Sequence, residues 1–251
     1  MNMEQAIIAS DHIKRYLIIP SGGSGVRMGA ELPKQYIRLG SKTILQHTIE
    51  ALAKHVDYIV LGISYDYRII VEDMLQTIGL ADRVHLTVAG KKRFDTVQRA
   101  LRVVPDGALV GIHDAVRPFV SGEVVDKCYE AAQQVGAAVP VLELTESLRY
   151  VPKEGAEQHS QATNRSLYRL VRTPQVFWSE RIKEAYQQPF QESFTDDCSV
   201  YDQLYSDLAL VPDTTENIKI TTPDQLYWGE HLLTTSRQER LRLTEKLLSS
   251  R

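Results

Sequence analysis

Two cations in a glycine-rich stretch are the residues whose types and spacing best suit chemistry. Segment 21–34 reads SGGSGVRMGAELPK and contains both Arg27 and Lys34. It follows an apolar run at 16–19, which predicts a buried strand, and it precedes a helical pattern at 43–52. Glycines let backbone N–H groups approach an anion closely, and the two side chains add fixed positive charge. This combination suits a triphosphate better than a dinucleotide.

The loop matches neither of the two common phosphate-binding motifs. A Walker loop has Lys and then Ser or Thr directly after its last glycine, whereas Gly25 is followed by Val26 and Arg27. The dinucleotide fingerprint needs a third glycine where Met28 stands. The alternative is a turn that merely joins a strand to a helix. The two cations favour phosphate binding over that alternative.

Length and composition set further bounds. The 251 residues are enough for a substantial core and predict a single domain over 1–251. A net charge of −3 gives no general attraction to nucleic acid or to an anionic membrane. Cys128 and Cys198 make neither a metal cluster nor a disulfide framework, which favours a cytoplasmic location. We expect no secretory signal and no membrane span.

Strand and helix patterns alternate through the first half of the chain. Strands are predicted at 57–63, 83–88, 108–113 and 137–142, and helices at 66–79, 95–104 (with Asp95 as N-cap) and 122–135. This alternation predicts an α/β fold with a doubly wound, mostly parallel sheet. Ligands of such sheets bind beyond the carboxyl ends of strands, where 20–34, 89–96 and 113–118 lie.

The alternation breaks at 143–165, a polar segment too long for an ordinary connection. It is either a disordered insert or an extended hairpin arm that docks on a partner subunit. Weaker signals follow. They predict strands at 167–171, 208–211 and 218–220, helices at 179–187 and 223–233 (the second capped by Thr222), and a terminal helix over 237–251.

Five charged segments, in their order along the chain, resemble those of a known family: 21–34, 90–97, 112–118, 164–175 and 216–221. The most diagnostic are His113-Asp-Ala-Val-Arg-Pro118 and the run from Arg27 to Gln35 that contains Pro33-Lys34. Over 16–233 the chain resembles the 2-C-methyl-D-erythritol 4-phosphate cytidylyltransferases of the non-mevalonate isoprenoid pathway. The resemblance implies transfer of CMP from CTP to methylerythritol phosphate with release of pyrophosphate, a Rossmann-like nucleotidyltransferase fold, Mg²⁺ as cofactor, and a homodimer formed through the 143–165 arm.

The resemblance also implies roles for individual residues. Arg27 and Lys34 would stabilise the transition state, while Arg165 and Lys219 would hold the acceptor for attack. The expected nucleotide-binding residues are Ser21, Gly22, Gly23, Gly25, Gly90, Thr96 and Asp114; the expected acceptor-binding residues are Arg165, Thr173, Thr195 and Lys219; Asp114 is also the expected metal ligand. Arg165 and Thr173 would come from the second subunit's arm.

Several alternatives stay open at this point. Asp114 and Arg117, three residues apart, also suit a brace for a turn, and the role of Arg93 is undecided. Asn164 stands where the family usually has Asp, which makes acceptor positioning the least secure inference. Ribitol 5-phosphate cytidylyltransferase is the nearest rival activity. A regulatory nucleotide-binding module is a rival of another class, but it would not need both Arg27 and Lys34.

Overall fold

The structure is a computed structural model that describes residues 13–23, 32–153, 155 and 157–235, together with residues 239, 242, 245, 246 and 249. Gly25 and Arg27 lie outside the described residues, as does most of the predicted terminal helix at 237–251.

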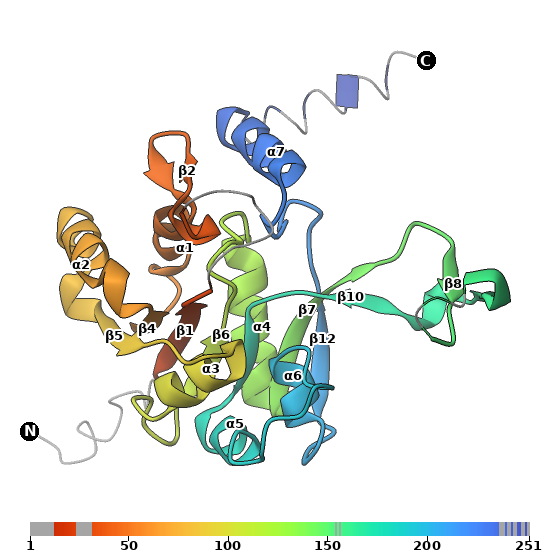
Figure 1. The fold of residues 1–251 in the computed structure, drawn as a ribbon, viewed down its shortest axis with the longest axis horizontal. Helices are drawn as coiled ribbons and strands as arrows, with labels where there is room; N and C mark the ends of the chain where they lie inside the picture. Colours follow the sequence, from red (N-terminus) through yellow and green to blue (C-terminus); the bar gives the residue numbers. More distant parts are fainter. Residues whose placement is uncertain are drawn as a thin grey trace, which may run out of the picture.

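A central sheet runs through the described part of the chain (Figure 1). Its strands are β1 (Arg15–Ser21), β4 (Tyr58–Ile63), β5 (Val84–Val88), β6 (Leu109–Ile112), β7 (Ala137–Glu143), β10 (Arg169–Val171), β11 (Gln175–Trp178) and β12 (Leu208–Pro212). Strands β6, β1, β4 and β5 pair in parallel, and so do β7 and β12. The predicted mostly parallel sheet is therefore confirmed.

One strand that the sequence pattern missed reverses direction in the middle of this sheet. Strand β11 lies between β6 and β7 and pairs antiparallel with both, and β10 continues the antiparallel pairing along β7. Because β11 runs backwards, it is its beginning, at Gln175, that lies beside the end of β6 at Ile112. The segment that enters β11 therefore reaches the same edge as the loops that leave the parallel strands.

Helices cover the two faces of the sheet (Figure 1). Helices α1 (Ile44–Leu52), α2 (Arg68–Thr77) and α4 (Gly122–Val135) pack on one face, and α3 (Arg93–Leu101), α5 (Ser179–Ala185) and α6 (Asp197–Tyr201) pack on the other. Successive side chains of a strand point to opposite faces, so in β1 Leu17 and Ile19 join the first cluster while Ile18 joins the second. Burial on both faces explains why 16–19 is continuously apolar.

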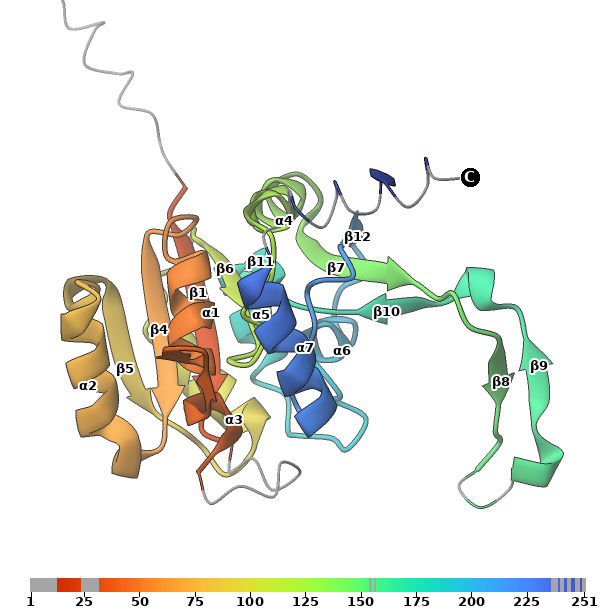
Figure 2. The same cartoon turned by 90° about the horizontal axis from the view of Figure 1, so that it is seen from above.

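The predicted arm projects away from the body of the molecule (Figure 2). Strands β8 (Leu148–Tyr150) and β9 (Gln161–Thr163) pair antiparallel as a separate two-stranded sheet. A short 3-10 helix, η7 (Arg165–Leu167), then leads back to β10. Segment 143–165 is therefore an extended hairpin rather than a disordered insert. The remaining elements are the small pair β2 (Arg38–Leu39) and β3 (Lys42–Thr43), the 3-10 helices η3 (Lys34–Tyr36), η4 (Tyr65–Tyr67), η5 (Ala81–Arg83) and η6 (Glu157–His159), and α7 (Pro223–Thr234).

Three local predictions were wrong. Helix α3 begins at Arg93, so Asp95 is its third residue and not its N-cap; its carboxylate accepts from the Lys92 backbone N–H at 2.9 Å. Residues 218–220 form no strand, because the apolar side chains of Ile218 and Ile220 pack against the cluster around Leu39 without a ladder. The strand predicted at 167–171 begins only at Arg169, because Leu167 belongs to η7. By contrast, α7 begins as predicted, with Thr222 as cap and Pro223 first. None of the described helices combines the length and apolar character needed to cross a bilayer.

Candidate active site

A cavity of about 240 Å³ opens at the carboxyl edge of the parallel strands. The loops after β1, β5 and β6 all line it, as the sequence predicted from their positions at strand ends. It brings together the predicted residues Ser21, Gly22, Gly23, Lys34, Gly90, Thr96, Asp114 and Lys219. Lys219 is the only one of these that comes from a distant, irregular segment.

Close backbone approach explains two of the glycines, since a Cβ on Gly90 would lie 2.2 Å from the Cβ of Asp95. A Cβ on Gly22 would lie 2.1 Å from the Cβ of Ala89, so only glycine lets the loops after β1 and β5 touch. The Gly90 backbone N–H donates to the Thr96 hydroxyl oxygen at 2.9 Å, and that hydroxyl donates to the Lys92 carbonyl at 3.1 Å. Thr96 therefore fixes the loop from inside α3 and does not cap the helix.

The Gln35 side chain binds the backbone at the start of the glycine-rich loop. Its buried amide nitrogen donates to the Ser21 carbonyl at 2.8 Å and to the Gly23 carbonyl at 3.0 Å. These bonds satisfy two backbone carbonyls in the described part of the loop and fix its path as it leaves β1. No sequence pattern predicts this role of Gln35, because its partners lie 14 and 12 residues away without a helical or strand period.

The lining of the cavity is strongly cationic. Lys34, Lys91, Lys92, Arg93 and Lys219 line it, and Asp114 is the one carboxylate among its described lining residues. The whole chain carries a net charge of −3, so this concentration is local. A polyanion such as a triphosphate is the ligand class that such a lining attracts.

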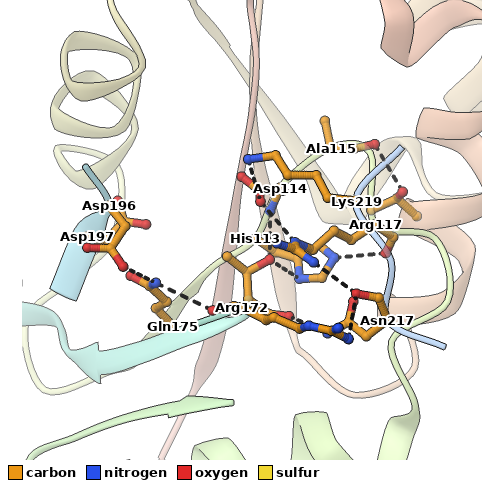
Figure 3. A network of polar contacts seen from close by, with 12 residues as sticks. His113, Asp114, Ala115, Arg117, Arg172, Gln175, Asp196, Asp197, Asn217 and Lys219 are labelled. Carbon is orange, nitrogen blue, oxygen red and sulfur yellow. Dashed lines mark hydrogen bonds and ion pairs between the residues drawn. The ribbon is translucent and has the colours of Figure 1, made fainter. Parts of the chain in front are cut away.

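Asp114 lies at the centre of a network of cations (Figure 3). Its Oδ2 is 3.0 Å from Arg117 Nε and 3.0 Å from Lys219 Nζ, and its Oδ1 is 3.7 Å from Arg93 Nε. Burial alone would raise the pKa of Asp114, but Arg93, Lys219 and Arg117 together hold that pKa well below its ordinary value. The carboxyl is therefore ionised, and the brace to Arg117 that the sequence suggested is present alongside the contact with Lys219.

Neighbouring residues supply hydrogen-bond partners to the His113 ring and the Thr173 hydroxyl. Burial lowers the pKa of His113 to about 4, so its ring is neutral near pH 7. Nε2 lies 3.1 Å from the Arg117 carbonyl and must carry the proton, which leaves Nδ1 to accept from the Thr173 hydroxyl at 3.1 Å. That hydroxyl in turn accepts from the Asp114 backbone N–H at 3.1 Å. His113 is thus a packed residue at the end of β6.

A second cavity, of about 300 Å³, adjoins the first. The predicted residues Thr173 and Thr195 line it, and Arg93, Asp114 and Lys219 line both cavities. Thr173 lies there within its own chain, next to Asp114, so the expectation that it would come from a second subunit's arm was wrong. Arg117 and Arg172 add two further cations to its lining. An anionic acceptor in the second cavity would be separated from a triphosphate in the first only by the shared residues.

Buried amides position Lys219. Asn217 Nδ2 donates to the Thr173 carbonyl at 3.0 Å and to Asp213 Oδ2 at 2.7 Å. The backbone carbonyl of Asn217 accepts from Nη1 of Arg117 at 2.8 Å and from Nη1 of Arg172 at 3.1 Å (Figure 3). These contacts fix the irregular segment that carries Lys219. No sequence pattern pointed to Asn217, because Thr173 and Arg117 lie 44 and 100 residues away from it.

Arg165 is not brought to the site within one chain. It is exposed on the arm, where its guanidinium donates to the Thr145 carbonyl, and it lines neither cavity. Figure 2 shows the arm projecting to one side of the body that carries the sheet. A role for Arg165 in catalysis stays a prediction that a single chain does not test.

The residues present fit a phosphate-bound Mg²⁺ better than a resident metal. Among the described residues, no group of three or more His, Cys, Asp or Glu side chains gathers in a way that could hold a metal ion. Mg²⁺ in nucleotide sites is typically held by one or two carboxylates together with substrate phosphates and water. The ionised Asp114 at the shared wall supplies one such carboxylate.

Comparison with known proteins agrees with this geometry. The sequence profile of the family described as 2-C-methyl-D-erythritol 4-phosphate cytidylyltransferase matches residues 16–235. The chain is 44% identical over 223 residues to the protein of that name from Porphyromonas gingivalis, covering 88% of this chain and 99% of the relative. It is 41% identical over 223 residues to the one from Phocaeicola vulgatus, covering 88% of this chain and 100% of the relative.

A solved structure shares the architecture. The crystal structure of 2-C-methyl-D-erythritol 4-phosphate cytidylyltransferase from Thermus thermophilus superposes with a TM-score of 0.70 at 27% identity, over 88% of this chain and 98% of that one. The profile and the relatives cover nearly the whole described body, including both cavities. The chain therefore belongs to the 2-C-methyl-D-erythritol 4-phosphate cytidylyltransferase family.

Proposed function

We propose that this protein transfers CMP from CTP to 2-C-methyl-D-erythritol 4-phosphate, giving 4-diphosphocytidyl-2-C-methyl-D-erythritol and pyrophosphate, in isoprenoid precursor biosynthesis. The observation that carries the proposal is the pair of adjoining cationic cavities whose shared wall contains Asp114 and Lys219. Two anions can be held there side by side. The 44% identity to a relative named for this activity supports the same acceptor.

The chemistry requires that two anions be brought together. An oxygen of the acceptor phosphate bonds to the α-phosphorus of CTP, and the bond from that phosphorus to the bridging oxygen of pyrophosphate breaks. Negative charge on the oxygens around phosphorus is stabilised by fixed cations. Lys34 and Lys219, which line the first cavity, would supply this charge. Arg27 joins them by resemblance to the family.

No general base is needed for this step, because the attacking phosphate is already anionic near neutral pH. The state of His113 is consistent with this account, since the residue is fully buried and its Nδ1 already accepts a hydrogen bond. Its contribution is to hold Thr173 and the turn at Asp114.

We also propose Mg²⁺ as the cofactor, arriving with the triphosphate. Asp114 would hold it, and the ion would neutralise phosphate charge.

A homodimer is the assembly that we propose, formed through the arm. Apolar side chains are exposed along the segment that returns from it: Leu167, Tyr168, Leu170 and Val171. A second copy that covers them would also bring Arg165 to the partner's acceptor cavity.

Both cysteines are free and buried, and on that basis we propose a reducing cytoplasmic location.

The direct test is a pyrophosphate-release assay with CTP, Mg²⁺ and either methylerythritol phosphate or ribitol 5-phosphate. We expect release with methylerythritol phosphate only. Release with ribitol phosphate only would assign the rival cytidylyltransferase activity. No release with either acceptor while CTP still binds would indicate the regulatory module.

Replacement of Lys34 tests the transition-state role. Because Lys34 lines the nucleotide cavity, Lys34→Ala should lower kcat by about 100- to 1,000-fold, the usual cost of removing one charge-stabilising group. Thermal unfolding monitored by circular dichroism should change little. A variant that unfolds while its folded fraction retains normal kcat would show that Lys34 has no catalytic role.

Mixed dimers test whether Arg165 acts on the partner's site. Arg165→Ala and Lys34→Ala should each be nearly inactive alone. Co-expressed in equal amounts, half of the dimers would contain one of each, and one of their two sites would have both native residues, which gives about a quarter of wild-type activity by two-fold symmetry. If Arg165 acts within its own chain, the mixture will show only the sum of the two residual activities.

The neutral state of His113 predicts a specific pH dependence of stability. Its pKa in the folded protein is about 4, against an ordinary value near 6.5, so at pH 5 the unfolded chain binds a proton that the folded chain does not. From pH 7 to pH 5 this residue should remove about 2 kcal/mol of the free energy of unfolding. Urea denaturation of His113→Gln should show a loss smaller by about that amount.

His85→Gln is the matched control, since His85 is exposed on β5 away from both cavities. It should show the wild-type loss of stability between the two pH values. An identical loss in the His113 variant would contradict the assignment of a buried neutral ring.

A further inference from the structure

A buried ion pair lies behind the wall that the two cavities share. Asp197, the first residue of α6, has a fully buried carboxylate, and its two oxygens accept from Nη1 and Nη2 of Arg93 at 2.8 and 2.7 Å. The Tyr186 hydroxyl donates to Asp197 Oδ1 at 2.6 Å. A bidentate, charge-assisted pair of this kind fixes the plane of a guanidinium as well as its position.

The other edge of the same guanidinium faces the site. Arg93 Nε lies 3.7 Å from Asp114 Oδ1, and the Arg93 side chain, about one third exposed, lines both cavities. Asp197 lines neither cavity. The contacts therefore run in series, from Asp197 through Arg93 to Asp114, and from Asp114 to Lys219.

This series joins two parts of the chain that serve different ligands. Arg93 is the first residue of α3 and follows the loop that carries Gly90 on the nucleotide side. Asp197 belongs to the segment that carries Thr195 on the acceptor side, 104 residues later. A pair that only stabilised the fold would not need an arginine whose remaining edge lies between the two cavities.

We propose that Asp197 is a positioning residue for nucleotidyl transfer, which fixes Arg93 so that Asp114 and Lys219 are held in line between the two phosphates. The proposal rests on the transferase function proposed above. Without the carboxylate, Arg93 turns towards Asp114 or towards a bound phosphate. Lys219 then shares its carboxylate partner with a mobile guanidinium and loses its fixed place.

The chain contains a matched control for this arrangement. Asp207 likewise accepts from an arginine, Arg181, and from a tyrosine hydroxyl, that of Tyr201 at 3.0 Å. This second tyrosine–aspartate–arginine group lines neither cavity. Asp207→Asn therefore disrupts the same kind of contact without touching the site.

A double-mutant cycle tests the proposal. We would measure kcat/KM with CTP and methylerythritol phosphate for the wild type, Asp197→Asn, Arg93→Gln, the double variant and Asp207→Asn. Asp197→Asn should lose about tenfold or more in kcat/KM, but less than about twofold when it is added to Arg93→Gln, because residues that act in series are not additive. Asp207→Asn should stay within about twofold of the wild type.

Two kinetic results would overturn the proposal: a wild-type kcat/KM for Asp197→Asn, or an equal fold-loss with and without Arg93. The second would mean that Asp197 acts on the fold alone. If Asp197→Asn does not fold, Tyr186→Phe replaces it, with a loss of about two- to fivefold expected only when Arg93 is present. An equal loss in both backgrounds would again overturn the proposal.

The wild type separates this inference from the function on which it rests. If the wild type and Asp207→Asn both release pyrophosphate and the cycle is additive, only the positioning role fails. If the wild type releases none with either acceptor, the proposed transfer fails and the positioning role fails with it.

Discussion

A single buried carboxylate sets the electrostatics of this site. Asp114 is mostly removed from water, and such a group is stable as an anion only when cations surround it. Arg93, Arg117 and Lys219 meet that requirement, and each comes from a different part of the chain. Because the Asp114 carboxylate needs cationic partners, it brings together the positive charges that a phosphate ligand would also contact. The same carboxylate keeps these cations from repelling one another before a ligand arrives.

Much of this arrangement could be predicted from local sequence. The apolar run at 16–19, the glycines after it and the strand-end positions of Gly90 and Asp114 follow from short-range rules, because strand burial and close backbone approach leave local signatures. The parallel sheet and the position of the cavity at its carboxyl edge followed from those elements. The polar segment at 143–165 left a disordered insert and an extended arm as alternatives; the family resemblance favoured the arm, and the pairing of β8 with β9 agrees with it.

What could not be predicted depends on long-range contacts without periodicity. Asn217 and Gln35 form their hydrogen bonds to carbonyls through their amide side chains, and no spacing rule connects them to their partners. The pairing of Arg93 with Asp197 spans 104 residues, so its two halves look like ordinary surface charges when read along the chain. Strand β11 was missed because it is only four residues long and begins with a polar residue, Gln175, and its reversed direction is set by the strands on either side.

Because β11 runs in the reverse direction, the two cavities are lined by different kinds of segment. The first cavity is lined by loops that leave parallel strands, whereas Thr173, which lines the second, stands on the segment that enters a strand running the other way. Insertions or substitutions in that entering segment can reshape the pocket for a sugar phosphate while the glycine-rich loop keeps its register. A scaffold of this kind can change its acceptor over evolutionary time without losing its nucleotide donor.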